Sequence, residues 1–257
     1  MTNSISNWKI STKKMYGLQE IISPEKSTLT KALYAYRLDL KKSMSQNIVN
    51  DKLELSFVLV EGEAKLKIDD KEYSMNKFDS FYIPSKTSVV ISTDSECTFY
   101  IGGAIDDGFG KFFFHKFDNT QPIGDTKQVH GQEPYQRDVY MTLGPKVEAS
   151  RLITGLTWSE EGKWSSWPPH EHEKDLEEGY WYFDMPAPKF GIHLSYEKSG
   201  EVTNAHIVRD GDMILAPYGY HPTVAAPSNK NAYFWILAAH SHTSRRYDLA
   251  NNDSAYL

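Results

Sequence analysis

Short segments that alternate apolar and polar residues, separated by turn residues, recur along the chain and constrain its fold more than any other feature. Residues 64–68 read Ala-Lys-Leu-Lys-Ile and are followed by the turn Asp69-Asp70. Similar strand-like segments occur at residues 53–62, 88–91, 98–101, 180–183, 191–196, 206–208, 213–217 and 233–237. Because closely spaced short strands form antiparallel sandwiches or barrels, the sequence predicts an all-β fold.

An internal repeat indicates that the chain has two similar halves. Residues 78–84 align with residues 211–217 at a constant offset of 133, and in both copies a turn leads into a strand that ends at a proline. The polar stretch 118–135, interrupted by glycine and proline, is the expected boundary. We therefore predict a first domain at residues 1–120 and a second at residues 136–257.

Composition narrows the classes of partner and compartment. A net charge of −6 argues against binding to a nucleic-acid backbone. Cys97 is the only cysteine, which excludes an internal disulfide and fits a reducing compartment. The first residues lack the order of a signal peptide, and no run approaches the ~18 apolar residues of a membrane span. These features predict a cytoplasmic protein with no nucleic-acid partner and no membrane partner.

Three histidines and a carboxylate in the second half have spacings that suit one metal ion. On an extended segment His170 and His172 share a face, so both imidazoles can reach one point. His221 would add a third imidazole, and Glu177 or Glu178 a carboxylate. Such a ligand set suits zinc, manganese, iron or nickel better than calcium or magnesium. The first copy of the repeat has no matching histidines, so we expect no metal there.

The remaining histidines have simpler interpretations. His240 and His242 form a second His-x-His pair without a carboxylate at a matching distance, and we interpret them as part of a polar segment. We expect His193 to be a hydrogen-bonded histidine of the core or rim rather than a substrate contact. His130 is interpreted as a surface or loop residue.

The segments around the predicted ligands resemble those of a known superfamily and of one family within it. A His-x-His pair, a later carboxylate and a Gly-(x5)-Pro-x-Gly run followed by histidine are similar to the two-part motif of the cupin superfamily. Residues 137–140, 164–172, 176–178, 217–222 and 225–227, with the run Trp-Ser-Ser-Trp-Pro-Pro-His-Glu-His, resemble the 5-deoxy-glucuronate isomerases of inositol catabolism. The resemblance covers most of the chain.

This resemblance implies two tandem cupin (jelly-roll) barrels with a metal site only in the C-terminal barrel. The implied ligands are His170, His172, Glu178 and His221, with Glu178 preferred to Glu177 because the family's ligand opens the aromatic strand. One divalent ion per chain is implied, zinc or manganese ahead of iron or nickel. The implied activity is an aldose-ketose isomerisation of 5-deoxy-glucuronate, a small sugar acid, to 5-dehydro-2-deoxy-gluconate.

Such a site can carry out the implied chemistry. Moving a carbonyl from C1 to C2 removes a proton next to an aldehyde, and a divalent ion stabilises the resulting enediolate. Glu178 or Glu177 is the candidate acid/base. Alternation from Glu178 turns Tyr180 and Tyr182 toward the cavity, and Tyr220 is a further hydroxyl donor.

The substrate's carboxylate requires a cationic side chain. Where the family carries arginines, this chain has Phe183 and Leu194. Lys189 and Arg151 are therefore the predicted substrate contacts, with Arg137, Arg209 and Arg245 also available. These departures keep two alternatives open, a related 4-deoxy-5-ketouronate isomerase and a non-catalytic sugar-binding or regulatory cupin. The sequence also leaves open whether the protein forms a homo-oligomer.

Overall fold

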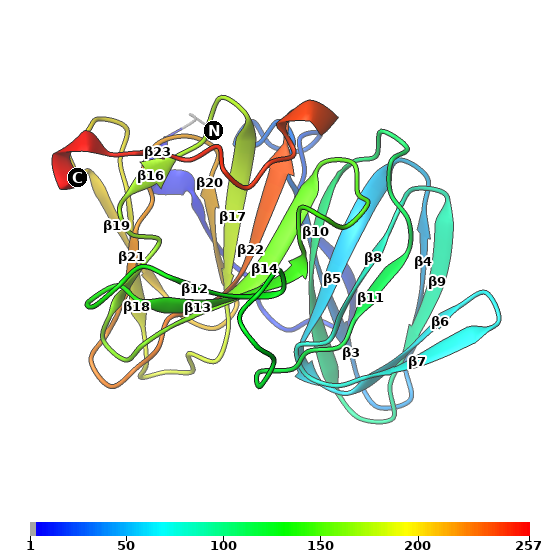
Figure 1. Cartoon of the computed structure of the whole chain (residues 1–257). Helices are drawn as coiled ribbons and strands as arrows, with labels where there is room; N and C mark the ends of the chain where they lie inside the picture. The colour runs from blue at the N-terminus through cyan, green and yellow to red at the C-terminus, as the bar shows by residue number, and fades with distance from the viewer. Residues whose placement is uncertain (1–3) are drawn as a thin grey trace.

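The computed structural model describes residues 4–257, which form an all-β protein. Within this range the helical segments are three short 3-10 turns, Ile5–Asn7, His242–Ser244 and Ser254–Tyr256. Figure 1 shows the strands gathered in two halves that lie side by side. The all-β prediction is confirmed. No helix in the described range is long and apolar enough to span a bilayer.

The first half consists of two sheets with a shared apolar core. The six-stranded sheet has the order β11 (Phe113–His115), β8 (Ser80–Ile83), β5 (Leu53–Gly62), β10 (Cys97–Ile105), β3 (Tyr34–Leu40), β2 (Gly17–Ile22). The four-stranded sheet has the order β4 (Ser45–Asn50), β9 (Thr87–Ser92), β6 (Ala64–Ile68), β7 (Lys71–Met75). In β6 the residues alternate between buried and exposed, as their apolar and polar side chains require.

The second half has a similar plan with three sheets. Its seven-stranded sheet has the order β1 (Lys9–Ser11), β20 (Asp212–Ala216), β17 (Leu176–Tyr182), β22 (Ala232–Ala239), β14 (Leu152–Ser159), β13 (Arg137–Leu143), β12 (Lys127–His130). The four-stranded sheet has the order β15 (Trp164–Ser165), β21 (Thr223–Ala225), β18 (Gly191–Ser195), β19 (Asn204–Val208). A third sheet pairs β16 (His170–Glu171) with β23 (Asn251–Asn252).

The predicted internal repeat is confirmed by strand order and by local geometry. The order β8-β5-β10-β3-β2 in the first half matches β20-β17-β22-β14-β13 in the second. Phe78 and Gly211, aligned in the sequence, both have positive φ, 74° and 80°. The next residue in each copy, Asp79 or Asp212, accepts a hydrogen bond from the backbone N–H three residues earlier.

A strand from the N-terminal end of the described chain joins the sheet of the second half. β1 precedes the first half in sequence but pairs with β20 of the second half, with Lys9 opposite Ile214. Trp8, beside it, is fully buried. The blue N-terminal segment accordingly lies among the strands of the second half in Figure 1. The domain limits 1–120 and 136–257 stay a prediction, and β1 and β12 both belong to the second half's sheet.

The two large sheets pack against each other through a continuous apolar interface. Tyr100 on β10 stacks on Trp181 on β17, with ring centroids 4.3 Å apart. Gly102 lets β10 approach β22 closely, because a Cβ there would lie 2.7 Å from a side-chain carbon of Ile236. This interface fixes β17 and β22, the strands beneath the predicted metal ligands.

Candidate metal centre

Four side chains from separate segments meet near one end of β17. His170 lies on β16, His172 follows in the adjoining turn, Glu178 lies on β17, and His221 lies between β20 and β21. Their potential ligand atoms all lie within 4.8 Å of one another. This is the set of residues that the sequence resemblance implied, and no other such group of three or more occurs within residues 4–257.

Hydrogen bonds orient the imidazoles toward a common point. Nδ1 of His170 donates to the carbonyl of Pro168 at 3.0 Å, and Nδ1 of His221 donates to the carbonyl of Gly219 at 2.9 Å. Because a carbonyl can only accept, the neutral form of each ring has its lone pair on Nε2, which faces the cluster. Nε2 of both His172 and His221 lies 3.0 Å from Oε2 of Glu178.

The electrostatics of the cluster match what a divalent cation needs. Burial opposes ionisation of Glu178, but hydrogen bonds and charge from His172 and His221 outweigh it and hold the pKa of Glu178 well below its usual range. Burial, together with His221 and His172, lowers the pKa of His170 to about 3. A carboxylate and a neutral imidazole are the protonation states that bind metal. The residues present therefore fit a divalent ion.

The cluster opens into a cavity of about 240 Å³ on the face of the second half's large sheet that is turned away from the first half. Its lining includes His170, His172, Glu178 and Tyr180. The hydroxyl of Tyr180 lies 3.1 Å from Oγ of Ser166, which also lines the cavity. Tyr180 therefore lines the cavity, and its contact with substrate stays a prediction.

Two other predicted substrate contacts lie away from this cavity. The hydroxyl of Tyr182 lies 2.7 Å from Nδ1 of His193 and donates to Oγ1 of Thr223, deep in the core. Tyr220 packs against Tyr196, with ring centroids 5.1 Å apart, and does not line the cavity. His193 is fully buried and hydrogen-bonded, as expected for a core histidine.

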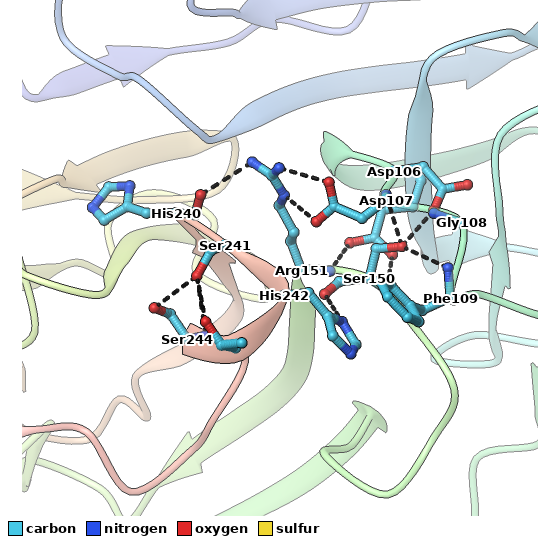
Figure 2. A network of polar contacts seen from close by, with 12 residues as sticks. Asp106, Asp107, Gly108, Phe109, Ser150, Arg151, His240, Ser241, His242 and Ser244 are labelled. Carbon is cyan, nitrogen blue, oxygen red and sulfur yellow. Dashed lines mark hydrogen bonds and ion pairs between the residues drawn. The ribbon is translucent and has the colours of Figure 1, made fainter.

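Neither of the two predicted basic contacts, Arg151 and Lys189, lines the cavity. Figure 2 shows that the guanidinium of Arg151 pairs with the carboxylate of Asp107, at 2.7 Å, and donates to the carbonyl of His240. Arg151 immediately precedes β14, where its side chain points into the junction between the halves. Lys189 is exposed on the turn between β17 and β18.

Glu177 also lies outside the cluster. It is next to Glu178 on β17, and successive side chains of a strand point to opposite faces. Its carboxylate accepts hydrogen bonds from the backbone N–H groups of Lys31, Ala32 and Leu33. The structure thus places Glu178, the preferred carboxylate, in the cluster and gives Glu177 a different set of partners.

Several residues of the cavity had no assigned site in the sequence-based prediction. Arg137 and His130 come from β13 and β12, and Tyr233 comes from β22. Tyr247 and Asn252 come from the C-terminal segment. Arg137 lies in one of the segments that carried the family resemblance, which was the available signal. No spacing rule connects the C-terminal residues with the His-x-His segment, because that proximity arises only on folding.

The C-terminal segment closes one side of the cavity. β23 pairs with β16, placing Asn252 opposite His170, and Figure 1 shows the red segment running beside β16. Asp253 anchors it: this fully buried carboxylate accepts from the hydroxyls of Tyr196 and Ser199 and from the backbone N–H of Gly200. The segment therefore contributes both a wall of the cavity and a partner strand for a predicted ligand.

In the second His-x-His pair, the ring of His242 contacts the first half. Nδ1 of His242 donates to the carbonyl of Ser150 at 2.8 Å, and its ring stacks on Phe109 at 3.8 Å (Figure 2). Nε2 of His240 donates to the carbonyl of Glu173. Each imidazole of the pair therefore has a backbone carbonyl as its hydrogen-bond partner.

Comparison with known proteins identifies the family of this chain. A model of the KduI/IolB family matches residues 11–256. The chain belongs to the KduI/IolB family. The resemblance inferred from the sequence is thereby confirmed at the level of the family.

Curated relatives in the KduI/IolB family carry two names. A protein of Geobacillus kaustophilus named 5-deoxy-glucuronate isomerase is 29% identical over 49% of this chain and 48% of its own length. A protein of Enterococcus faecalis named 4-deoxy-L-threo-5-hexosulose-uronate ketol-isomerase 2 is 23% identical over 83% of this chain and 77% of its own length. The chain thus aligns with about half the length of the first relative and with more of the second.

Solved structures support the fold. An IolB-like protein of Salmonella typhimurium LT2 superposes with a TM-score of 0.84 at 22% identity, over 97% of this chain and 98% of that one. A mutant of the oxalate decarboxylase of Bacillus subtilis superposes with a TM-score of 0.62 at 14% identity, over 90% and 77%. The all-β architecture is shared across this range of sequences.

Proposed function

We propose that the protein is a metal-dependent aldose-ketose isomerase that converts 5-deoxy-glucuronate to 5-dehydro-2-deoxy-gluconate in myo-inositol catabolism. The observation that carries the proposal is the convergence of His170, His172, Glu178 and His221 at the cavity of a KduI/IolB chain. The proposal includes a cytoplasmic protein of two tandem cupin barrels, with one zinc or manganese ion in the second. The names of the curated relatives support an isomerase.

The ligand set indicates separate roles for the ion and for the protein in the reaction. A bound divalent ion would offset the negative charge that develops on the substrate oxygens when the proton next to the carbonyl is removed. Glu178 is our candidate for carrying that proton between C2 and C1. Its Oε2 faces His172 and His221, whereas its Oε1 has no hydrogen-bond partner within residues 4–257. Among the lining residues Glu178 is the one carboxylate.

Arg137 is the proposed partner for the acid group of the substrate. It is the one arginine or lysine in the lining of the cavity. Its Nη1 donates to the carbonyls of Trp167 and Tyr135, at 3.1 and 3.3 Å, which fixes the plane of the guanidinium. Nε and Nη2 have no hydrogen-bond partner in the described part of the chain. A guanidinium held in this way can bind a carboxylate through two parallel hydrogen bonds.

One relative favours a second candidate activity. The Enterococcus faecalis protein, which aligns with more of the chain than the first relative does, is named for the isomerisation of 4-deoxy-L-threo-5-hexosulose-uronate. That compound is also a deoxy sugar acid, so the same ion and the same arginine would serve. The two candidates differ in where the substrate lacks its hydroxyl group and carries its carbonyl.

Turnover of both sugar acids by the purified protein tests the proposal. We expect NMR to show conversion of 5-deoxy-glucuronate, loss of conversion after chelation, and recovery when zinc or manganese is restored. His221→Ala should abolish metal binding and turnover. His240→Ala, which removes an imidazole outside the cluster, is the matched control and should retain both.

Other outcomes would point elsewhere. Conversion of the hexosulose-uronate alone would select the second candidate. Binding of a sugar acid without conversion in the metal-loaded protein would indicate a sugar-binding or regulatory cupin and overturn the proposal.

A further inference from the structure

Glu177 connects the strand of the metal cluster to the other half of the molecule. Its carboxylate, 2% exposed, receives the backbone N–H groups of Lys31, Ala32 and Leu33 at 2.8, 2.9 and 3.1 Å. The hydroxyl of Thr30 lies 2.6 Å from the same carboxylate. All four donors belong to the loop that precedes β3 of the first half. Four donors on one buried carboxylate therefore tie this loop to β17.

Glu54 makes the reciprocal connection. This fully buried residue of β5 receives the backbone N–H groups of Ser150, Arg151 and Leu152, at the start of β14 in the second half. The hydroxyl of Tyr82 donates to the same carboxylate at 2.6 Å. Each half therefore provides one buried carboxylate that accepts three backbone N–H groups and one hydroxyl.

The strand register shows that the two carboxylates occupy equivalent positions. Glu54 on β5 is paired with Ala104 on β10, and Glu177 on β17 is paired with Ala238 on β22. The residue after Glu177 is the predicted ligand Glu178, whereas the residue after Glu54 is Leu55. Leu55 lines an apolar hollow of about 120 Å³ in the first half. The two connections thus differ in what lies on the opposite face of the strand.

We propose that Glu177 is a positioning residue that aims Glu178 at the metal ion, and that the first half, whose described residues contain no such cluster, supplies the loop that holds it. Glu177 and Glu178 share a peptide bond and point to opposite faces, so a shift of one carboxylate along or across the strand shifts the other. The inference rests on the proposed metal site. Glu54, which has no ligand to position, provides an internal control.

A substitution by glutamine separates positioning from stability. In Glu177→Gln an amide nitrogen replaces an acceptor and meets N–H groups, so part of the connection is lost with little change in side-chain volume. Glu54→Gln makes the same change on the other side of the interface. If both connections served stability alone, the two variants would behave alike in every measurement.

The experiment measures metal affinity and melting temperature for both variants of the full chain. Metal-free Glu177→Gln and Glu54→Gln should both melt below the wild type. Glu177→Gln alone should bind Co²⁺ or Zn²⁺ about tenfold more weakly, the size of effect known for groups that orient metal ligands. The visible absorption spectrum of bound Co²⁺, which reports ligand geometry, should change in Glu177→Gln and not in Glu54→Gln.

Milder variants keep the test decisive if a glutamine variant fails to fold. Thr30→Val and Tyr82→Phe each remove one hydroxyl from one of the two carboxylates, and only Thr30→Val should alter the Co²⁺ spectrum. Equal metal affinity and equal spectra across the matched variants would overturn the positioning role while leaving the metal site intact. Absence of metal binding by the wild type would instead overturn the proposed function, and this inference with it.

Discussion

At the scale of single residues, side-chain direction decided which predicted residues reach the site. His170 and His172 are two residues apart on an extended segment, and Tyr180 is two residues from Glu178, so the alternation of a strand was enough to place them. Charge alone did not place the basic residues. Arg151 immediately precedes β14, and its side chain points into the junction between the two halves. It pairs there with the carboxylate of Asp107 and does not reach the cavity.

Replacing Arg137 by alanine should raise the KM for the sugar acid about 10- to 100-fold, as expected for the loss of a charge-assisted hydrogen-bonded pair. The value of kcat should change less, because the carboxylate is remote from the reacting carbons. Steady-state kinetics on the metal-loaded protein measure both. Arg151→Ala is the matched control and should leave KM unchanged. An unchanged KM in Arg137→Ala would remove Arg137 from the substrate site.

At the scale of elements, the C-terminal segment shows how a short and irregular stretch can complete a site. β23 has two residues, both exposed, and would not persist alone. It is held by the buried carboxylate of Asp253 and by Trp167, whose ring lies 5.1 Å from that of Tyr256. The site therefore depends on an element that has no helical or strand signal of its own.

Loss of the Asp253 carboxylate should loosen this segment. Burial opposes its ionisation, but hydrogen bonds from Ser199, Ala255, Gly200 and Tyr196 outweigh it and lower the pKa of Asp253 to about 2. Since this lies below the unfolded value of about 3.9, the carboxylate stabilises the fold above pH ~4, and the contribution disappears as the pH falls toward 2.

Asp253→Asn should reduce the free energy of unfolding by about 2 kcal/mol at pH 7 and flatten its dependence on pH below 4. Denaturant unfolding at a series of pH values measures the first effect. Amide hydrogen exchange should be faster in residues 246–257 of the variant than in the same residues of the wild type. The first half should exchange at the same rate in both proteins. Identical exchange in variant and wild type would show that Asp253 does not anchor the segment.

At the scale of the whole molecule, strand pairing, aromatic stacking and buried hydrogen bonds join the two halves. β1 completes the sheet of the opposite half, Tyr100 stacks on Trp181, and Glu54 and Glu177 each bind the loop of the other half. A cut between the repeats would expose the apolar interface and would remove the backbone N–H donors that each half supplies to the buried carboxylate of the other, Glu54 or Glu177. Both effects strongly disfavour a separated half.

Residues 136–257 expressed alone should therefore lack a cooperative unfolding transition and should bind metal more weakly than the full chain. Circular dichroism during thermal unfolding and a metal titration test this expectation. The control is the full chain prepared in the same way. A fragment that melts cooperatively and binds metal with full affinity would show that the second half is autonomous.

The amino-acid sequence was sufficient for the features that depend on near neighbours along the chain. Alternation predicted the strands, the repeat predicted the matching strand orders, and the motif around His170 predicted the family and the four converging side chains. These inferences succeed because strand periodicity and local motifs are properties of short segments.

Contacts between distant segments required the folded molecule. The pairing of β1 and the partners of Glu177 and Arg151 depend on how the two halves pack. The entry of Arg137, Tyr247 and Asn252 into the cavity depends on how the second half folds. Glu177 and Glu178 are chemically identical neighbours, and only the face of β17 that each occupies makes one a metal ligand candidate and the other an anchor. Burial and hydrogen bonding across the interface set that difference, and neither is encoded in local spacing.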